Sequence, residues 1–63
     1  MASKHLMSVL QELLYDLKDQ KPIIDGMAEG KDEEYRRVLL GAYEDAYSGL
    51  RALYFAAKAD LDS

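Results

Sequence analysis

One stripe of side chains in the second half of the chain combines residue types that bind other macromolecules. Its members follow one another at spacings of four, three and four residues, so a helix places them along one edge: Tyr47, Arg51, Tyr54 and Lys58. Aromatic rings interleaved with cations can stack on nucleic-acid bases, or they can dock on an acidic protein surface. In a purely structural alternative, the tyrosines cover the margin of the core and the cations extend beside them. The stripe is therefore a candidate partner-binding site.

Phe55 lies next to this stripe and out of phase with the apolar face of the same predicted helix. Its phase predicts either a contact with a second helix or an exposed ring that anchors a partner. Leu40 is off-phase in the same way. We therefore add Phe55 to the partner-binding candidates.

Catalytic and metal-binding chemistry has little support in the sequence. The only histidine is His5, close to the N-terminus, and the chain has no cysteine, which excludes disulfides and thiolate metal sites. Glu12 and Asp16 stand at helical spacing, but no Glu-x-x-His motif accompanies them. Gly26 and Gly30 lack the context of a phosphate-binding loop. We expect a non-enzymatic protein with no catalytic residue, no cofactor and no metal.

The charge balance is mildly acidic, with a formal net charge of −4 over 63 residues. This balance makes nucleic acid a less favoured partner than protein, and it disfavours binding to anionic membranes. The longest apolar run, residues 52–57, is far too short to span a bilayer, and no secretory leader opens the chain. We expect a soluble, cytoplasmic protein that does not bind membranes.

The first third of the chain has the spacing of one helix face. The positions that carry it are Leu6, Leu10, Leu13 and Leu17. Ser3 is a plausible N-cap, and the same phase continues to Ile24 and Met27. Pro22 interrupts this pattern because proline lacks an N–H and clashes with the preceding turn. Either one helix over about residues 4–29 is kinked at Pro22, or it breaks near Gln20 and Pro22 opens a short second helix.

A turn at residues 30–32 separates this segment from a second helix over about residues 33–60. Gly30 can take the left-handed position that closes one helix, and Asp32 can cap the next. Glu33 and Glu34 then fall in the first turn, where negative charge suits the helix dipole. Two arms of similar length predict one all-α domain over residues 1–63, an antiparallel helical hairpin.

An eleven-residue register of apolar positions runs through the second helix and predicts a nearly straight helix with one apolar side. It includes Tyr35, Ala46 and Ala57, and likewise Leu39, Leu50 and Leu61. The predicted core face comprises Val38, Leu39, Ala42, Tyr43, Ala46, Tyr47, Leu50, Leu53, Tyr54 and Ala57.

This face is broader than one partner helix covers, and small residues lie beside it. Glycine in a helix interior costs up to about 1 kcal/mol relative to alanine, so such residues suggest close packing by another helix. The candidate oligomer interface comprises Gly41, Gly49, Ala52, Ala56, Leu50 and Leu53. Short chains without disulfides or metals commonly gain stability by association. We expect a homodimer in which two hairpins form a four-helix bundle.

Three functions from different classes remain open on the sequence alone. The favoured one is a small protein-interaction module, a regulator, adaptor or inhibitor that binds a larger protein. The second is an RNA- or DNA-binding hairpin that uses Arg51 and Lys58. The third is a purely structural oligomerisation unit in which Tyr47 and Tyr54 are buried between copies.

Overall fold

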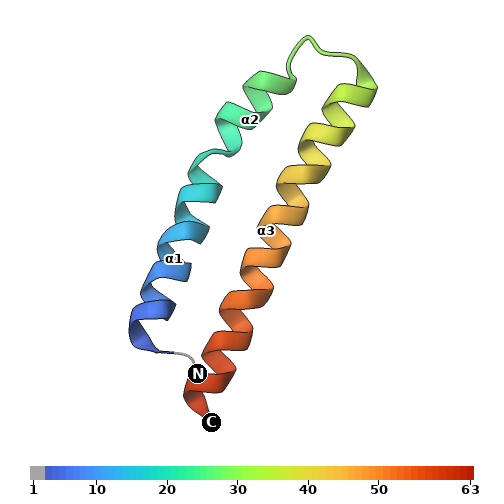
Figure 1. Cartoon of the computed structure of the whole chain (residues 1–63). Helices are drawn as coiled ribbons and strands as arrows, with labels where there is room; N and C mark the ends of the chain where they lie inside the picture. The colour runs from blue at the N-terminus through green and yellow to red at the C-terminus, as the bar shows by residue number, and fades with distance from the viewer. Residues whose placement is uncertain (1–2) are drawn as a thin grey trace.

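The chain forms two antiparallel helical arms in a computed structural model that describes residues 3–63 (Figure 1). The first arm consists of α1 (Lys4–Asp19) and α2 (Lys21–Ala28), and the second arm is the single helix α3 (Glu33–Asp62). The principal extents are 47 × 17 × 11 Å. Every regular element within residues 3–63 is helical, so the predicted all-α hairpin with a bent first arm is the observed architecture.

The bend in the first arm is a break of one residue at Gln20. The N–H of Gln20 donates to the carbonyl oxygens of Asp16 and Leu17, at 3.1 and 3.2 Å, and closes α1. The N–H of Ile24 then donates to the Gln20 carbonyl at 2.9 Å, which opens α2. Pro22 lies in the first turn of α2, where its missing N–H removes no helical hydrogen bond. The structure thus has the second of the two arrangements considered for Pro22.

Side-chain caps define where the arms begin and end. The Ser3 hydroxyl accepts from the N–H of Leu6 at 3.1 Å, and the Asp32 carboxylate accepts from the N–H of Tyr35 at 2.7 Å. Gly30 takes a φ of 75°, the left-handed conformation that glycine adopts without strain. These contacts satisfy backbone groups that a helix leaves unpaired at its ends, and they fix the turn between the arms.

The residues that face the opposite arm recur at alternating spacings of three and four. We call this set the seam. In the first arm it comprises Met7, Leu10, Leu14, Leu17, Lys21, Ile24 and Ala28, and in α3 it comprises Leu40, Tyr43, Tyr47, Leu50, Tyr54 and Ala57. All are buried or half-buried, and in a two-armed molecule only the other arm can cover them. The spacing is that of helices that wrap around each other. Of residues 3–63, only Leu10, Ala28 and Ala57 fall below a tenth exposed.

The predicted core face is broader than the observed seam: it includes the seam residues Tyr43, Tyr47, Leu50, Tyr54 and Ala57, but it also includes exposed residues. Leu6 and Leu13 are 38% and 45% exposed, whereas Leu40, taken as off-phase, lies in the seam. The eleven-residue register also fails, because Ala57 is buried while Tyr35 is exposed. An eleven-residue repeat describes a nearly straight helix, whereas two arms that stay in contact along their length follow a seven-residue repeat. Other predicted core residues that are exposed are Val38, Ala42, Ala46 and Leu53.

Candidate protein-interaction surfaces

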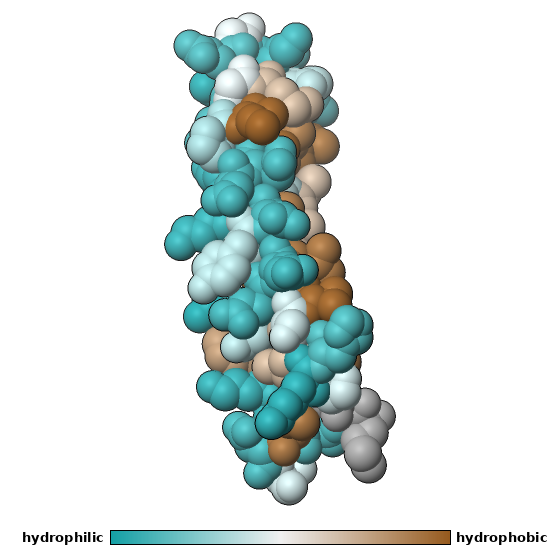
Figure 2. All heavy atoms as spheres, turned by 90° about the vertical axis from the view of Figure 1, so that its left-hand side faces the viewer, coloured by the Kyte–Doolittle hydropathy of each residue, from teal (hydrophilic) through white to brown (hydrophobic). Residues whose placement is uncertain are grey.

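A continuous apolar surface runs along one side of the hairpin. The two arms run antiparallel and contact each other through a seven-residue repeat. In each arm, the residue just before Met7, or just before the position equivalent to Met7 in each repeat, therefore lies on the same side of the hairpin. We call this surface the apolar face: Leu6, Val9, Leu13, Ile23 and Met27 of the first arm, with Tyr35, Leu39, Ala42, Ala46, Gly49, Leu53 and Ala56 of α3. Figure 2 views the outer side of the first arm, where hydrophilic residues cover most of the surface and hydrophobic residues gather toward one edge. The seam therefore leaves about half of the large apolar side chains to solvent.

The apolar face is hollowed at the turn end of α3. An open groove of about 490 Å³ lies there, lined by Asp32, Glu34, Tyr35, Val38, Leu39 and Ala42. Its walls are mostly hydrocarbon, and the two carboxylates stand at one end. Such a groove accepts apolar side chains from another helix more readily than it accepts a charged ligand.

The predicted oligomer-interface residues do not lie on one surface. Leu50, which is also on the predicted core face, belongs to the seam and is half-buried within the hairpin, so it does not lie on the apolar face. Gly41 follows the seam residue Leu40 and is half-buried, outside the apolar face. Gly49, Leu53 and Ala56 lie on the apolar face, and Ala52 is exposed on the outer side of α3. Of the six predicted residues, three therefore share the apolar face, and the oligomer interface stays a prediction.

The glycines of α3 have no packing role inside the hairpin. A methyl group added at Gly41 or Gly49 meets no atom of this chain within 4 Å beyond its own helical surroundings. The cost of glycine in a helix is therefore not offset by any contact between the arms. At Gly49, which lies on the apolar face, the missing side chain leaves room for a second helix to approach.

The predicted partner-binding stripe divides between the seam and the surface. Tyr47 and Tyr54 are half-buried in the seam, and the Tyr47 ring stacks on Tyr43 with ring centroids 6.5 Å apart. Arg51, Phe55 and Lys58 are exposed beside them. The tyrosines thus resemble the structural alternative, with rings that cover the margin of the core, and the cations and Phe55 remain accessible.

Arg51 and Phe55 form the centre of this accessible surface. The Arg51 guanidinium lies 5.5 Å from the centroid of the Phe55 ring. The Tyr54 ring meets the Phe55 ring edge to face, with centroids 5.5 Å apart. Stacking on these rings restricts the motion of both exposed side chains, which lowers the entropy that a partner must remove on binding.

The first arm adds residues that sequence reasoning did not associate with this stripe. A groove of about 210 Å³ between the arms is lined by Gln11, Leu14, Tyr15, Lys18, Tyr47 and Tyr54. Tyr15 is 59% exposed at this groove. We call the combined surface the basic edge: Tyr15, Lys18, Arg51, Phe55 and Lys58. The basic edge lies on the opposite side of the seam from the apolar face. It combines residues of both arms, so spacing within one helix does not predict it.

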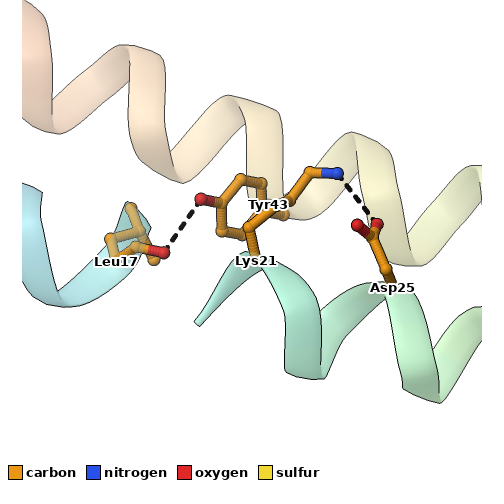
Figure 3. Close-up of polar contacts among 4 residues, drawn as sticks. All are labelled: Leu17, Lys21, Asp25 and Tyr43. Atoms are coloured by element: carbon orange, nitrogen blue, oxygen red, sulfur yellow. Dashed lines mark hydrogen bonds and ion pairs between the residues drawn. The ribbon is translucent and has the colours of Figure 1, made fainter. Parts of the chain in front are cut away.

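A polar cluster stabilises the bend of the first arm (Figure 3). The Tyr43 hydroxyl donates to the Leu17 carbonyl oxygen at 2.8 Å. The Lys21 ammonium lies 5.9 Å from the Tyr43 ring centroid and donates to the Asp25 carboxylate at 2.8 Å. This hydrogen bond raises the pKa of Lys21 above its ordinary value. A lysine is tolerated in the seam here because its side chain remains 44% exposed and its charge pairs with Asp25.

Removing the Tyr43 hydroxyl tests this cluster. Tyr43→Phe is expected to lower the free energy of unfolding by about 1 kcal/mol, because it removes a half-buried hydrogen bond to a carbonyl at the end of α1. Urea unfolding followed by circular dichroism measures the change. Tyr35→Phe is the matched control, since Tyr35 is 44% exposed and its hydroxyl makes no hydrogen bond within residues 3–63. Equal changes in the two variants contradict a structural role for this hydrogen bond.

Neither a cluster of metal-binding side chains nor a membrane-spanning helix is found in the part of the chain that the structure describes. No three histidine, cysteine or acidic side chains of residues 3–63 are grouped so that they could hold a metal ion. Over the same residues, no helix combines the length and the hydropathy needed to cross a bilayer.

Comparison with known proteins provides no further assignment. The chain matches no family model, no curated protein and no solved structure. The two surfaces, the apolar face and the basic edge, are therefore the basis for considering its function.

Proposed function

We propose that this protein is a cytoplasmic, non-enzymatic protein-interaction module that acts as a homodimer and regulates, adapts or inhibits a larger protein. The observation that carries the proposal is the apolar face, which extends along both arms. A second copy covers this face, and the basic edge on the opposite side stays free for another partner.

The exposed area supports a second copy as the occupant of the apolar face. The isolated hairpin exposes 4953 Å². A compact monomer of 7.1 kDa exposes roughly 4,100 Å² according to the scaling of surface with mass. The excess of roughly 850 Å² is close to the area of about 800 Å² that each partner buries in a standard interface. One hairpin therefore exposes an excess comparable to one subunit's share of a stable dimer interface.

The shape of the face also suits self-association. Leucines from both arms flank a smooth strip on α3 that contains Ala42, Ala46 and Gly49. In a twofold dimer the same patch meets itself, so the bulky side chains of one copy lie against the small residues of the other. The result is a four-helix bundle with an apolar centre and the charged residues outside.

The absolute mass in solution tests this proposal. Light scattering coupled to size exclusion, at loading concentrations from about 1 µM to about 500 µM, is expected to show twice the 7.1 kDa chain mass at the upper end and dissociation on dilution. Circular dichroism on the same samples reports whether the chain is helical. A helical species of 7.1 kDa across the whole range contradicts the dimer and leaves the apolar face to a different protein.

A further inference from the structure

The basic edge concentrates positive charge on a chain that is acidic overall. The net charge is −4, yet three cations, Lys18, Arg51 and Lys58, follow seam residues on the same side of the hairpin. On the side of the turn, two acidic residues bound this stretch: Glu44 follows the seam residue Tyr43, and Asp25 follows the seam residue Ile24. Negative charge is therefore concentrated elsewhere on the molecule, and this side attracts an acidic partner.

The cations of the basic edge are available for a partner. Among residues 3–63 the one ion pair within 4.0 Å joins Lys21 to Asp25, so no carboxylate of the described chain pairs with Lys18, Arg51 or Lys58. Arg51 lies against the Phe55 ring, which leaves the hydrogen-bonding edge of its guanidinium able to receive a carboxylate. A carboxylate of a partner gains a contact here without displacing an ion pair.

The groove beside these cations has the shape of an anchor site. Its volume of about 210 Å³ suits one aliphatic or aromatic side chain, and Leu14, Tyr47 and Tyr54 provide apolar walls. Gln11 and Lys18 stand in the same lining as polar groups. Interfaces obtain most of their affinity from such pockets, with tyrosine and arginine prominent among the residues involved.

We infer that the basic edge binds an acidic segment of another protein, with one apolar side chain in the groove and carboxylates against Lys18, Arg51 and Lys58. This inference rests on the proposed function, because it names the chemistry of the partner that the interaction module takes. A protein segment is favoured over nucleic acid because the groove accommodates one side chain between tyrosines rather than successive bases.

Fluorescence anisotropy with a labelled peptide tests the inference. The probe is a Glu-rich peptide that carries leucine at helical spacing, and a second peptide replaces every Glu with Gln. Arg51→Glu and, in the other arm, Lys18→Glu are each expected to weaken binding of the Glu-rich peptide about tenfold or more. Lys31→Glu changes the net charge equally but lies at the turn against Tyr35, so it is expected to alter binding less than about twofold.

Each other outcome overturns the inference. Equal losses in Arg51→Glu and Lys31→Glu attribute binding to net charge alone, and equal binding of the Gln peptide removes the role of carboxylates. Tighter binding of a single-stranded RNA oligonucleotide than of the Glu-rich peptide assigns the edge to nucleic acid. Absence of saturable peptide binding by the wild-type chain also overturns it.

The solution mass of every variant separates this inference from the dimer. If the wild-type chain is monomeric but binds the peptide through Arg51, the dimer fails and the basic edge stands. If the chain is dimeric but does not bind the peptide, the basic edge fails and the dimer stands. Circular dichroism confirms that each charge-reversal variant remains helical, as expected for exposed positions.

Discussion

Leu53→Glu is expected to convert the proposed dimer into a folded monomer and to weaken self-association by more than about a hundredfold. Leu53 is 52% exposed in the hairpin and lies on the apolar face, so a second copy covers it in the proposed bundle. A buried carboxylate without a partner costs several kcal/mol, and the twofold axis places two of them in each dimer. The hairpin itself keeps its helices, because the substitution leaves the seam unchanged. Sedimentation equilibrium measures the dissociation constant.

Phe55→Glu is the matched control for this prediction. Phe55 is also 52% exposed, lies two residues further along the same helix and belongs to the basic edge. Its substitution removes a similar apolar area and adds the same charge, so the two variants differ in the side of the hairpin that is changed. Dissociation by Phe55→Glu with no effect of Leu53→Glu places the contact between copies on the basic edge and contradicts the proposed bundle.

The local features of the fold were predictable because they depend on single residues. Ser3 and Asp32 cap helices because their side chains accept hydrogen bonds from free N–H groups, and Gly30 permits the turn. Pro22 marks a break because it has no N–H to donate. Such rules need no knowledge of the other arm, and the helical hairpin follows from them together with the apolar spacing.

The seam was harder to predict because the chain contains two adjacent apolar faces. Leu10 and Leu13 stand on the same stripe in the sequence, yet Leu10 is 3% exposed and Leu13 is 45% exposed. The spacing of apolar residues gives only the average direction of all apolar side chains around the helix axis. When two apolar faces are adjacent, this average direction falls between them. Lys21 in the seam adds to the error, because its charge marks it as a surface residue while its ammonium lies 5.9 Å from the centroid of the Tyr43 ring.

The same limit applies to the interaction surfaces. Arg51, Phe55 and Lys58 were identified from spacing within one helix, whereas Tyr15 and Lys18 joined them only when the antiparallel register was known. A groove between two arms depends on which residues lie opposite each other, and spacing within one segment carries no such information. Spacing also leaves open whether Tyr47 and Tyr54 cover the margin of the core or bind a partner, because these two positions differ by a small rotation of the helix.

Folding and association are expected to be linked in this molecule. Only three side chains of the described chain fall below a tenth exposed, so the hairpin alone has a small core. In the proposed dimer, covering the apolar face adds burial that the single hairpin lacks, and mass action then makes the measured stability depend on protein concentration. A substitution in the seam is therefore expected to lower the stability of the single hairpin. A substitution on the apolar face is expected to lower stability only at concentrations where two copies associate.

Leu10→Ala is expected to lower the free energy of unfolding by about 2–5 kcal/mol at every protein concentration, because Leu10 is the most buried residue of the seam. For a hairpin with so small a core, this loss removes most of its helix at ambient temperature. Leu13→Ala removes the same atoms three residues away on the apolar face, and its cost is expected mainly at concentrations where the dimer forms. Urea unfolding followed by circular dichroism, at one concentration below the dissociation constant and one above it, measures both variants. An equal loss for the two variants at the lower concentration contradicts the seam, because it puts both leucines in a single core within one hairpin.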